Sequence, residues 1–307
     1  MSAPVPLGLG LAAVGRPAYI TTARDADLGA PAERSIDAMR ARAHELLDEA
    51  WGLGIRYIDT ARSYGYAEQF LGAWLAAHPE RRGALTIGSK WGYAYVGGWR
   101  MDADVHERKE HSAAMLDRQW PETLDALGSP PDLYLVHSVT PDSPVLADSA
   151  VMSRLRALRE SGVRVGLSTS GPHQGEVLRA ALSLDDSPFR AVQSTWNLRE
   201  ATVSDALAEA HAVGWTVVLK EVLANGELAT AAPGSDLERA ASGIPADAFA
   251  IGVARAQPFA DVVLVGATTR EHLRAGVAAS PILPTALDAL AADPVDYWRA
   301  RSARPWR

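Results

Sequence analysis

Residues 33–65, ERSIDAMRARAHELLDEAWGLGIRYIDTARSYG, join an amphipathic segment to a short apolar run that ends in a carboxylate. Over 33–51 the apolar residues recur at three- and four-residue spacing, which predicts a helix, and Gly52 provides its stop. The apolar run 55–59 predicts a strand that ends at Asp59, and Tyr64 follows five positions later. The stretch therefore predicts a helix–strand unit with polar residues where the strand ends.

The same unit recurs along most of the chain, because apolar runs alternate with helical segments. This alternation is typical of parallel βαβ units. The predicted strands are 7–11, 55–59, 85–89, 133–137, 163–168, 191–195, 215–219 and 261–266. The further predicted helices are 67–77, 113–126, 149–160, 173–182, 203–212 and 270–278. Pro121 is expected to kink the helix 113–126 or to start a new one. We therefore expect a single (β/α)8 TIM barrel over residues 1–307.

Two segments are longer than a barrel connection requires. They follow the third and the seventh predicted strands, at 91–111 and 221–257. Long loops of this kind usually have a function, so both are expected at the rim of the barrel. The tail 284–307 is expected to form one or two helices that could cover a barrel face.

Composition narrows the class of protein. The 307 residues, 48% hydrophobic and 22% charged, are typical of a soluble globular protein. The sequence has no cysteine, which excludes disulfides, thiolate nucleophiles and cysteine-ligated metals. A net charge of −7 argues against a nucleic-acid partner. The start of the sequence resembles no leader and no apolar segment is long enough to span a membrane, so we expect a cytoplasmic protein with no membrane partner. No metal is predicted, and the oligomeric state is left open.

Four polar residues stand at or just after the ends of predicted strands: Asp59, Tyr64, Lys90 and His137. In a TIM barrel these strand ends form the active site. The Lys90 ammonium would lower the pKa of the Tyr64 phenol, Asp59 would hold Lys90, and His137 would orient or protonate a carbonyl oxygen. Each residue alone has common structural roles, but together they suit protonation of an alkoxide as hydride reaches a ketone or aldehyde.

Two fragments resemble the aldo-keto reductase family: Ile58-Asp-Thr-Ala61 with Tyr64-Gly65, and Leu133-Tyr-Leu-Val-His-Ser138. The resemblance covers roughly the whole chain at the level of barrel layout. It implies a nicotinamide cofactor bound without a Rossmann fold, NADP(H) more than NAD(H). It also implies that Ser168, Thr169 and Gln193 hold the carboxamide, with Thr169 standing where the family usually has Asn.

The resemblance also assigns the rest of the cofactor site. Lys220 stands where the family commonly places an aromatic residue under the nicotinamide, and Trp196 is an alternative platform. For Lys220, a structural salt bridge, a ligand contact and Schiff-base chemistry all remain open. The residues implied for the adenosine-phosphate end are Gly266, Thr268, Arg270 and His272, and Gly276 replaces the family's adenine-contacting Asn.

The aromatic loop after the third strand offers a substrate wall. Its candidate residues are Trp91, Tyr93 and Trp99, together with Tyr95, and loop packing is an equal alternative.

The function predicted from these residues is a carbonyl reductase, or the reverse alcohol dehydrogenase, with Tyr64 as general acid/base and a small carbonyl or alcohol compound as substrate. Two alternatives stay open. One is a proton-transfer enzyme without net redox change, such as a dehydratase or an isomerase. The other is a cofactor-sensing regulatory subunit.

Overall fold

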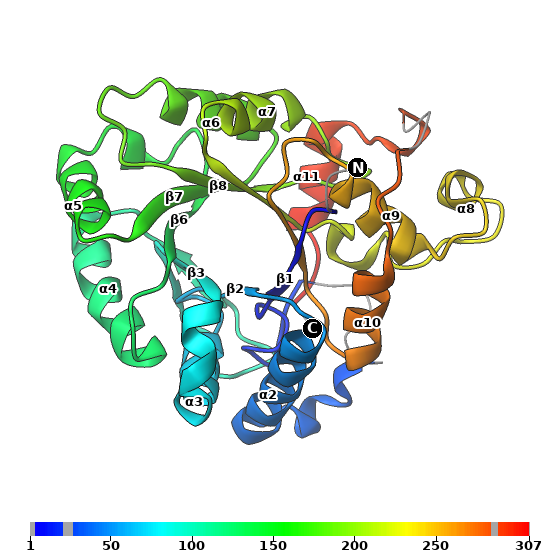
Figure 1. Ribbon diagram of the computed structural model, residues 1–307, viewed down its shortest axis with the longest axis horizontal. Coiled ribbons are helices and arrows are strands. Elements are labelled where there is room, and N and C mark those ends of the chain that lie inside the picture. The colour runs from blue at the N-terminus through cyan, green and yellow to red at the C-terminus, as the bar shows by residue number, and fades with distance from the viewer. Residues whose placement is uncertain (1–3, 21–26, 284–287, 307) are drawn as a thin grey trace.

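Eight parallel strands close into a barrel in the computed structural model, which describes residues 4–20, 27–283 and 288–306. Around the barrel the order is β1-β10-β9-β8-β7-β6-β3-β2, and Figure 1 looks into it. The strands are β1 (Leu7–Gly10), β2 (Tyr57–Asp59), β3 (Thr86–Trp91), β6 (Leu133–Val139), β7 (Arg164–Thr169), β8 (Ala191–Thr195), β9 (Thr216–Lys220) and β10 (Val262–Val265). All eight predicted strands are confirmed, and so is the TIM barrel.

Helices surround the barrel, as Figure 1 shows. They are α2 (Ile36–Gly52), α3 (Ala67–Ala77), α4 (Ala113–Leu127), α5 (Ser149–Glu160), α6 (Gln174–Leu182), α7 (Ser204–Ala212), α8 (Asp236–Ala241), α9 (Ala246–Arg255), α10 (Arg270–Ala278) and α11 (Pro294–Ser302). Helix α2 begins three residues later than predicted, because Ser35 caps it by accepting a hydrogen bond from the Ala38 amide. Helix α4 runs through Pro121 and ends at Leu127, and Gly128, whose φ of 73° suits glycine, caps it.

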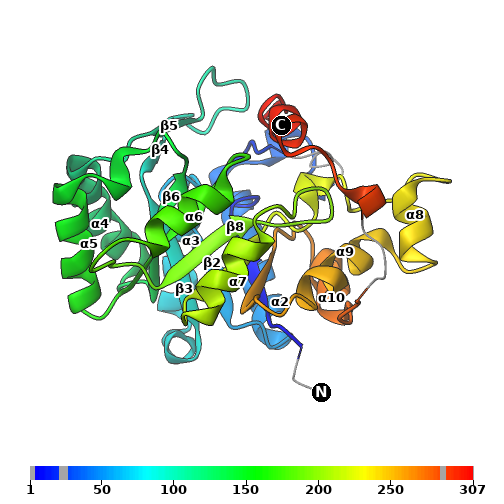
Figure 2. The ribbon, with the colours of Figure 1, turned by 90° about the horizontal axis from the view of Figure 1, so that it is seen from above.

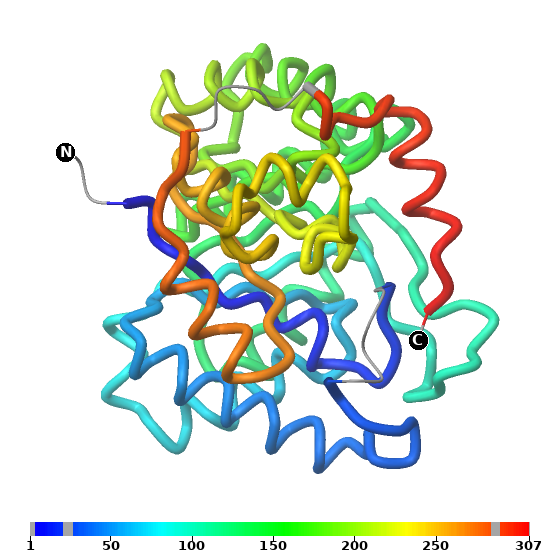
Figure 3. Tube along the Cα trace, turned by 90° about the vertical axis from the view of Figure 1, so that its right-hand side faces the viewer, coloured from blue at the N-terminus to red at the C-terminus, as the bar shows by residue number. Residues whose placement is uncertain are grey.

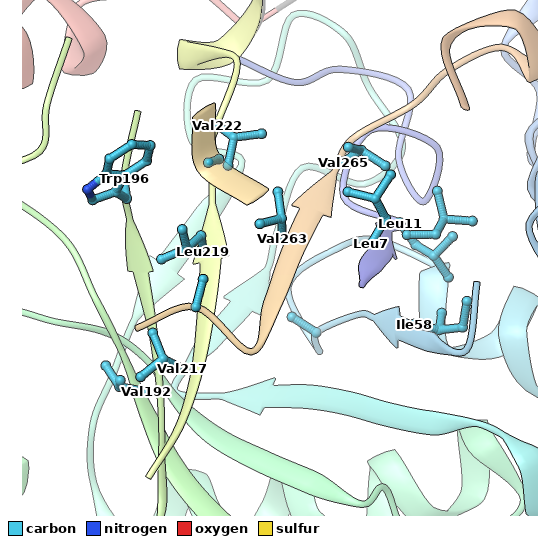
Figure 4. Close-up of a cluster of buried hydrophobic side chains, with 14 of the residues drawn as sticks. Leu7, Leu11, Ile58, Val192, Trp196, Val217, Leu219, Val222, Val263 and Val265 are labelled. Carbon is cyan, nitrogen blue, oxygen red and sulfur yellow. The ribbon is translucent and has the colours of Figure 1, made fainter. Parts of the chain in front are cut away.

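Side chains of the barrel strands alternate between the axis and the helices. Val217, Leu219, Val263 and Val265 belong to the large core outside the barrel, part of which Figure 4 shows. The opposite faces build a second, inner cluster from Tyr57, Leu133, Leu135, Ala191, Val218, Val262 and Leu264. Two residues further along their strands stand Asp59, His137, Gln193 and Lys220. Because side chains alternate strictly, these four also face the axis, one layer nearer the carboxyl ends of the strands.

Both long loops contain secondary structure. The loop after β3 forms an antiparallel hairpin of β4 (Tyr93–Tyr95) and β5 (Glu107–Lys109), and the loop after β9 contains α8 and α9. Figure 2 places the hairpin and α11 at the same end of the barrel. In Figure 3 the red C-terminal segment lies beside the cyan loop of the hairpin. The rings of Trp306 and His106 stack there, 4.4 Å apart. The predicted covering role of the tail is thus confirmed for its described residues.

Among the described residues, no helix is both long and apolar enough to cross a membrane.

Candidate active site

Lys90 and Asp59 form a buried ion pair inside the barrel mouth. Lys90 Nζ donates to Asp59 Oδ2 at 2.6 Å and to the Thr60 carbonyl oxygen at 2.9 Å. From β8, Gln193 Nε2 donates to the other Asp59 oxygen at 2.7 Å. Burial lowers the pKa of Lys90, and the Asp59 carboxylate opposes that shift. Asp59 therefore holds the lysine in place, as the sequence predicts.

Tyr64 and His137 lie beside this pair. Their rings meet edge to face with centroids 5.5 Å apart, and Lys90 Nζ is 4.7 Å from the Tyr64 ring centroid. Both side chains are at most 9% exposed. The structure thus brings together the four residues that the sequence selects. Asp59, Tyr64, Lys90 and His137 form the tetrad of this site.

The pKa of Tyr64 shifts in the direction opposite to the predicted one. Burial raises it well above the usual phenol value, the Asp59 charge raises it further, and the Arg16 guanidinium opposes the shift. The main reason is burial, because loss of water disfavours the charged phenolate more than the neutral phenol. Tyr64 is therefore a protonated phenol at neutral pH, which makes it a proton donor.

His137 is a neutral imidazole. Burial lowers its pKa well below the usual value, and the charges of Lys90 and Lys220 lower it further. Its Nδ1 lies 3.4 Å from Ser63 Oγ. We assign the tautomer in which the Ser63 hydroxyl donates to Nδ1 and the ring proton sits on Nε2, since the distance alone does not set the direction. Of the two predicted roles of His137, orienting a carbonyl oxygen therefore fits better than protonating it.

The backbone at His137 is irregular and is held by His111, a residue that the sequence analysis missed. The register of β6 against β7 shifts between Val136 and Val139, and Ser138 has a φ of 52°. His111 Nε2 donates to the His137 carbonyl oxygen at 2.8 Å. Burial, and then Lys109, lower the pKa of His111 to about 4. This histidine is consequently neutral at pH 7 and fixes the position of His137.

Ser168 and Gln193 offer an open polar pair on neighbouring strands. They are register partners of β7 and β8, and both face the barrel axis. Ser168 Oγ and Gln193 Oε1 are buried without a hydrogen-bond partner among the described residues. Such groups are costly unless something pairs with them. A carboxamide supplies both an acceptor and donors, so these two residues fit the carboxamide of a nicotinamide.

Thr169, Trp196 and Trp91 need correction as site residues, because all three point away from the barrel axis. Each directly follows an inward-facing residue and so faces the helices. Thr169 Oγ1 donates to Gln174 Oε1 at 3.1 Å, and Trp196 Nε1 donates to Ser204 Oγ at 2.9 Å. Figure 4 shows Trp196 in the outer core, and Trp91 is fully buried there. None of the three can reach a ligand in the barrel mouth.

The aromatic residues of the β3 loop separate into two groups. Tyr93 lies beside the site, with its ring centroid 5.0 Å from that of His137. Trp99 instead packs 5.3 Å from the Tyr66 ring and donates through Nε1 to the Arg34 carbonyl oxygen. Tyr93 is thus positioned to contact a substrate, whereas Trp99 serves loop packing.

The loop after β10 presents basic and acidic groups together. Thr268 Oγ1 donates to Asp27 Oδ2 at 2.7 Å, and His272 Nδ1 lies 4.0 Å from the same oxygen. Arg270 is exposed and lies 3.6 Å from Glu45. Gly266 is exposed directly after β10, and its Cβ position is open. Helix α10 begins here, and helix N-termini favour phosphate. Asp27 is a charge that the sequence analysis missed.

Lys220 ends β9, and Glu221 follows it with a φ of 56°. Lys220 Nζ donates to Thr195 Oγ1 at 2.8 Å and lies 3.6 Å from Glu221 Oε1. The Glu221 carboxylate accepts two hydrogen bonds from Arg301 on α11, at 2.5 and 2.7 Å. Burial opposes ionisation of Glu221, but Arg301 and Lys220 prevail and lower its pKa to about 2. Arg301 is therefore the main ion-pair partner of Glu221, and Lys220 is a second, more distant one.

Arg16 covers the mouth next to Tyr64, and no sequence pattern indicates it. Its Nη1 donates to the Ser63 carbonyl oxygen and to Glu107 Oε1, at 2.9 and 2.6 Å. The guanidinium carbon lies 5.2 Å from the Tyr64 ring centroid and 4.6 Å from that of Trp306. Segments from both ends of the chain therefore meet above the tetrad.

A closed parallel barrel with this tetrad at its carboxyl rim defines a barrel oxidoreductase. The Aldo/keto reductase family model matches residues 30–241, and the chain belongs to that family. Members of the family use nicotinamide cofactors.

Similar proteins agree with this assignment. An aldo-keto reductase of Gibberella moniliformis is 30% identical over 166 residues, which are 53% of this chain and 46% of that protein. Pyridoxal 4-dehydrogenase of Microbacterium luteolum is 31% identical over 118 residues, 33% of this chain and 34% of that protein. The chain thus spans less than half the length of these relatives. A Pseudomonas aeruginosa structure described as an aldo-keto reductase is 27% identical with a TM-score of 0.64, covering 93% of this chain and 90% of that one.

Proposed function

We propose that the protein is a nicotinamide-dependent carbonyl reductase, reversible as an alcohol dehydrogenase, with Tyr64 as its general acid/base. The observation that carries the proposal is the position of the Tyr64 phenol, which lies beside the His137 ring and next to the Lys90–Asp59 pair. The bound cofactor would supply the hydride.

Each side chain of the tetrad has a separate role in the proton transfer. His137 Nε2 donates a hydrogen bond that orients the carbonyl oxygen, and the Tyr64 hydroxyl gives that oxygen its proton as the carbon receives hydride. The Lys90 ammonium, 4.7 Å from the ring centroid, stabilises the phenolate that forms. Asp59 keeps the ammonium in place, and Tyr64 regains its proton from solvent. In the reverse direction the phenolate accepts the proton of the alcohol.

The cofactor contacts follow from the inner layer and from the β10 loop. Ser168 and Gln193 would hold the carboxamide, while Arg270, His272 and the start of α10 would hold the adenosine phosphates. We favour NADP(H), as the family resemblance implies, with Arg270 and His272 as the basic groups for a 2′-phosphate. Glu45 lies 3.6 Å from Arg270 and Asp27 lies 4.0 Å from His272. Since the Asp27 carboxylate repels a 2′-phosphate, Asp27→Asn is expected to tighten NADPH binding and to leave NADH binding unchanged.

The substrate class is a small carbonyl or alcohol compound, with Tyr93 as its aromatic contact. Two relatives are named as an aldo-keto reductase and a pyridoxal 4-dehydrogenase, which is consistent with carbonyl chemistry of this kind.

The test begins with titration of the purified protein with NADPH and NADH, followed by nicotinamide fluorescence. Micromolar binding, and then oxidation of the bound cofactor by members of an aldehyde and ketone panel, would support the proposal. Binding without hydride transfer to any member of a broad panel would count against it. Turnover that continues after the cofactor has been stripped would favour the non-redox alternative.

A further inference from the structure

Lysine is rare in this protein and occurs only near the barrel mouth. The sequence has 30 lysine and arginine residues, and only positions 90, 109 and 220 are lysine. Lys90 and Lys220 end the inner faces of β3 and β9, and Lys109 ends the hairpin strand β5. Arginine provides a permanent charge, whereas a buried lysine is compact and can lose its proton. The rest of the chain uses arginine for positive charge, so lysine is confined to the region of the mouth.

Lys220 lies in the inner layer of the mouth but does not belong to the tetrad. Its side chain is 13% exposed and faces the barrel axis, and it donates one hydrogen bond, to Thr195 Oγ1 at 2.8 Å. The neighbouring carboxylate of Glu221 is 3.6 Å away and is held bidentately by Arg301. Because Arg301 shares the Glu221 carboxylate, the Lys220 ammonium is only partly neutralised on the side that faces the mouth.

The carboxamide site borders Lys220 directly. Gln193, with its open Oε1, pairs in register with Val218, and Thr195 pairs with Lys220. Adjacent strands are about 4.8 Å apart, and a two-residue step along a strand is about 6.6 Å. A ring whose carboxamide binds Ser168 and Gln193 has the Lys220 ammonium on the next strand, one inner position nearer the mouth.

We propose that Lys220 makes the protein bind the reduced nicotinamide cofactor more tightly than the oxidised one. The nicotinamide ring carries a positive charge only in its oxidised form, so the ammonium repels that form and leaves the neutral reduced ring unaffected. The proposal rests on the proposed function, specifically on the carboxamide contacts of Ser168 and Gln193. Tighter binding of the reduced cofactor makes the site better suited to carbonyl reduction than to alcohol oxidation.

The effect depends on pH in a defined direction. Burial lowers the pKa of Lys220 to about 8, Glu221 opposes that shift, and Arg301 and Lys90 reinforce it. His137 also faces the ammonium, from β6. Of these groups, Glu221 has a pKa of about 2, that of His137 is far below its usual value, and Arg301 stays charged. Lys90 is held by Asp59. The preference should therefore be full below pH 7 and fade as pH rises through 8.

The test measures dissociation constants for NADPH, by its fluorescence, and for NADP⁺, by displacement of NADPH, at pH 6.5 and 9.5. The ratio is the dissociation constant of NADP⁺ divided by that of NADPH. In the unmodified protein it should fall by about tenfold from pH 6.5 to pH 9.5, the size expected for a partly screened charge at close range. Titration of the 2′-phosphate affects both forms alike and cancels in the ratio.

Two variants separate charge from packing. Lys220→Met should give the low ratio at both pH values. Lys220→Arg should give the high ratio at both, because arginine does not titrate in this range. Lys109→Met is the matched control, since its Nζ is bonded to Thr140 Oγ1 on the hairpin side of the mouth, and its ratio should match that of the unmodified protein.

The outcomes are distinct. A Lys220→Met protein whose ratio equals that of the unmodified protein at pH 6.5 would overturn the inference. If that variant fails to fold, a Lys220→Arg ratio that still falls with pH would overturn it. Failure of the unmodified protein to bind either cofactor would instead refute the proposed function.

Discussion

The two halves of the barrel mouth handle their polar groups differently. On β2 and β3, Asp59 and Lys90 satisfy each other in an ion pair at 2.6 Å. On β7 and β8, Ser168 Oγ and Gln193 Oε1 are left open. Gln193 joins the halves, because its amide nitrogen binds Asp59 and its oxygen binds nothing among the described residues. Pairing within the protein therefore fixes Lys90 and Asp59 in place, whereas Ser168 and Gln193 keep hydrogen-bonding capacity for a ligand.

Tyr64→Phe should have the largest effect, on catalysis and not on cofactor binding. Removing the proton donor should lower kcat/KM by about 10²–10⁴-fold, the usual contribution of general acid/base catalysis. Steady-state kinetics and fluorescence titration would show whether the NADPH dissociation constant stays within about twofold. A parallel loss of binding would show that the two halves are not separable.

Glu221→Gln should mainly affect stability. It leaves Arg301 on α11 without its charge partner, and breaking such a pair costs about 3 kcal/mol, the lower end for buried pairs because Arg301 is 17% exposed. Urea unfolding would measure the loss, and a double variant with Arg301→Met should recover part of it.

The same pair should contribute to acid sensitivity. The pKa of Glu221 is depressed to about 2 in the folded protein, so the pair stabilises the fold above the ordinary carboxyl pKa near 4.5. That contribution should be lost as pH falls from about 4.5 toward 2. Unfolding midpoints of Glu221→Gln should decline less over that range than those of the unmodified protein, and equal declines would rule out this assignment.

His111→Leu tests whether catalysis depends on the residue that holds the His137 backbone. Without the hydrogen bond to the His137 carbonyl oxygen, the irregular backbone at Ser138 should relax and displace His137, which lowers kcat by about tenfold. Binding of NADPH should not change. His111→Gln keeps a donor and should recover part of the rate, whereas equal losses in both variants would point to a purely structural role.

Ser168→Ala and Thr169→Val form the smallest and most discriminating pair. The Ser168 hydroxyl has no partner to lose, so its removal should leave stability unchanged and weaken NADPH binding by about fivefold to tenfold, as for one hydrogen bond. The Thr169 hydroxyl is bonded to Gln174 and Ser194, so its removal should cost about 1 kcal/mol of stability and leave binding unchanged. Thermal unfolding and NADPH titration of both variants would test this. A loss of stability in Ser168→Ala, or a loss of NADPH binding in Thr169→Val, would contradict the prediction.

The sequence predicts the barrel and the tetrad well because both depend on local patterns. Apolar runs locate the strands, and polar residues at their ends locate the rim. Thr169, Trp196 and Trp91 were misplaced although the information was present, since a residue next to an inward-facing one must face outward. Arg16, Asp27, His111 and Arg301 were unpredictable for another reason. They come from loops and the tail, and only the folded chain brings them to the site.

The scarcity of lysine also makes the protein suited to spectroscopy. Reductive methylation with ¹³C-formaldehyde labels accessible amines and keeps their charge. Lys90 is fully buried and should resist the reagent, whereas Lys109 and Lys220 are partly exposed. Apart from the terminal amine, the NMR spectrum would therefore contain two reporter signals, one from the hairpin side of the mouth and one from the end of β9. A ligand that enters the mouth could be followed from both sides without any engineered label.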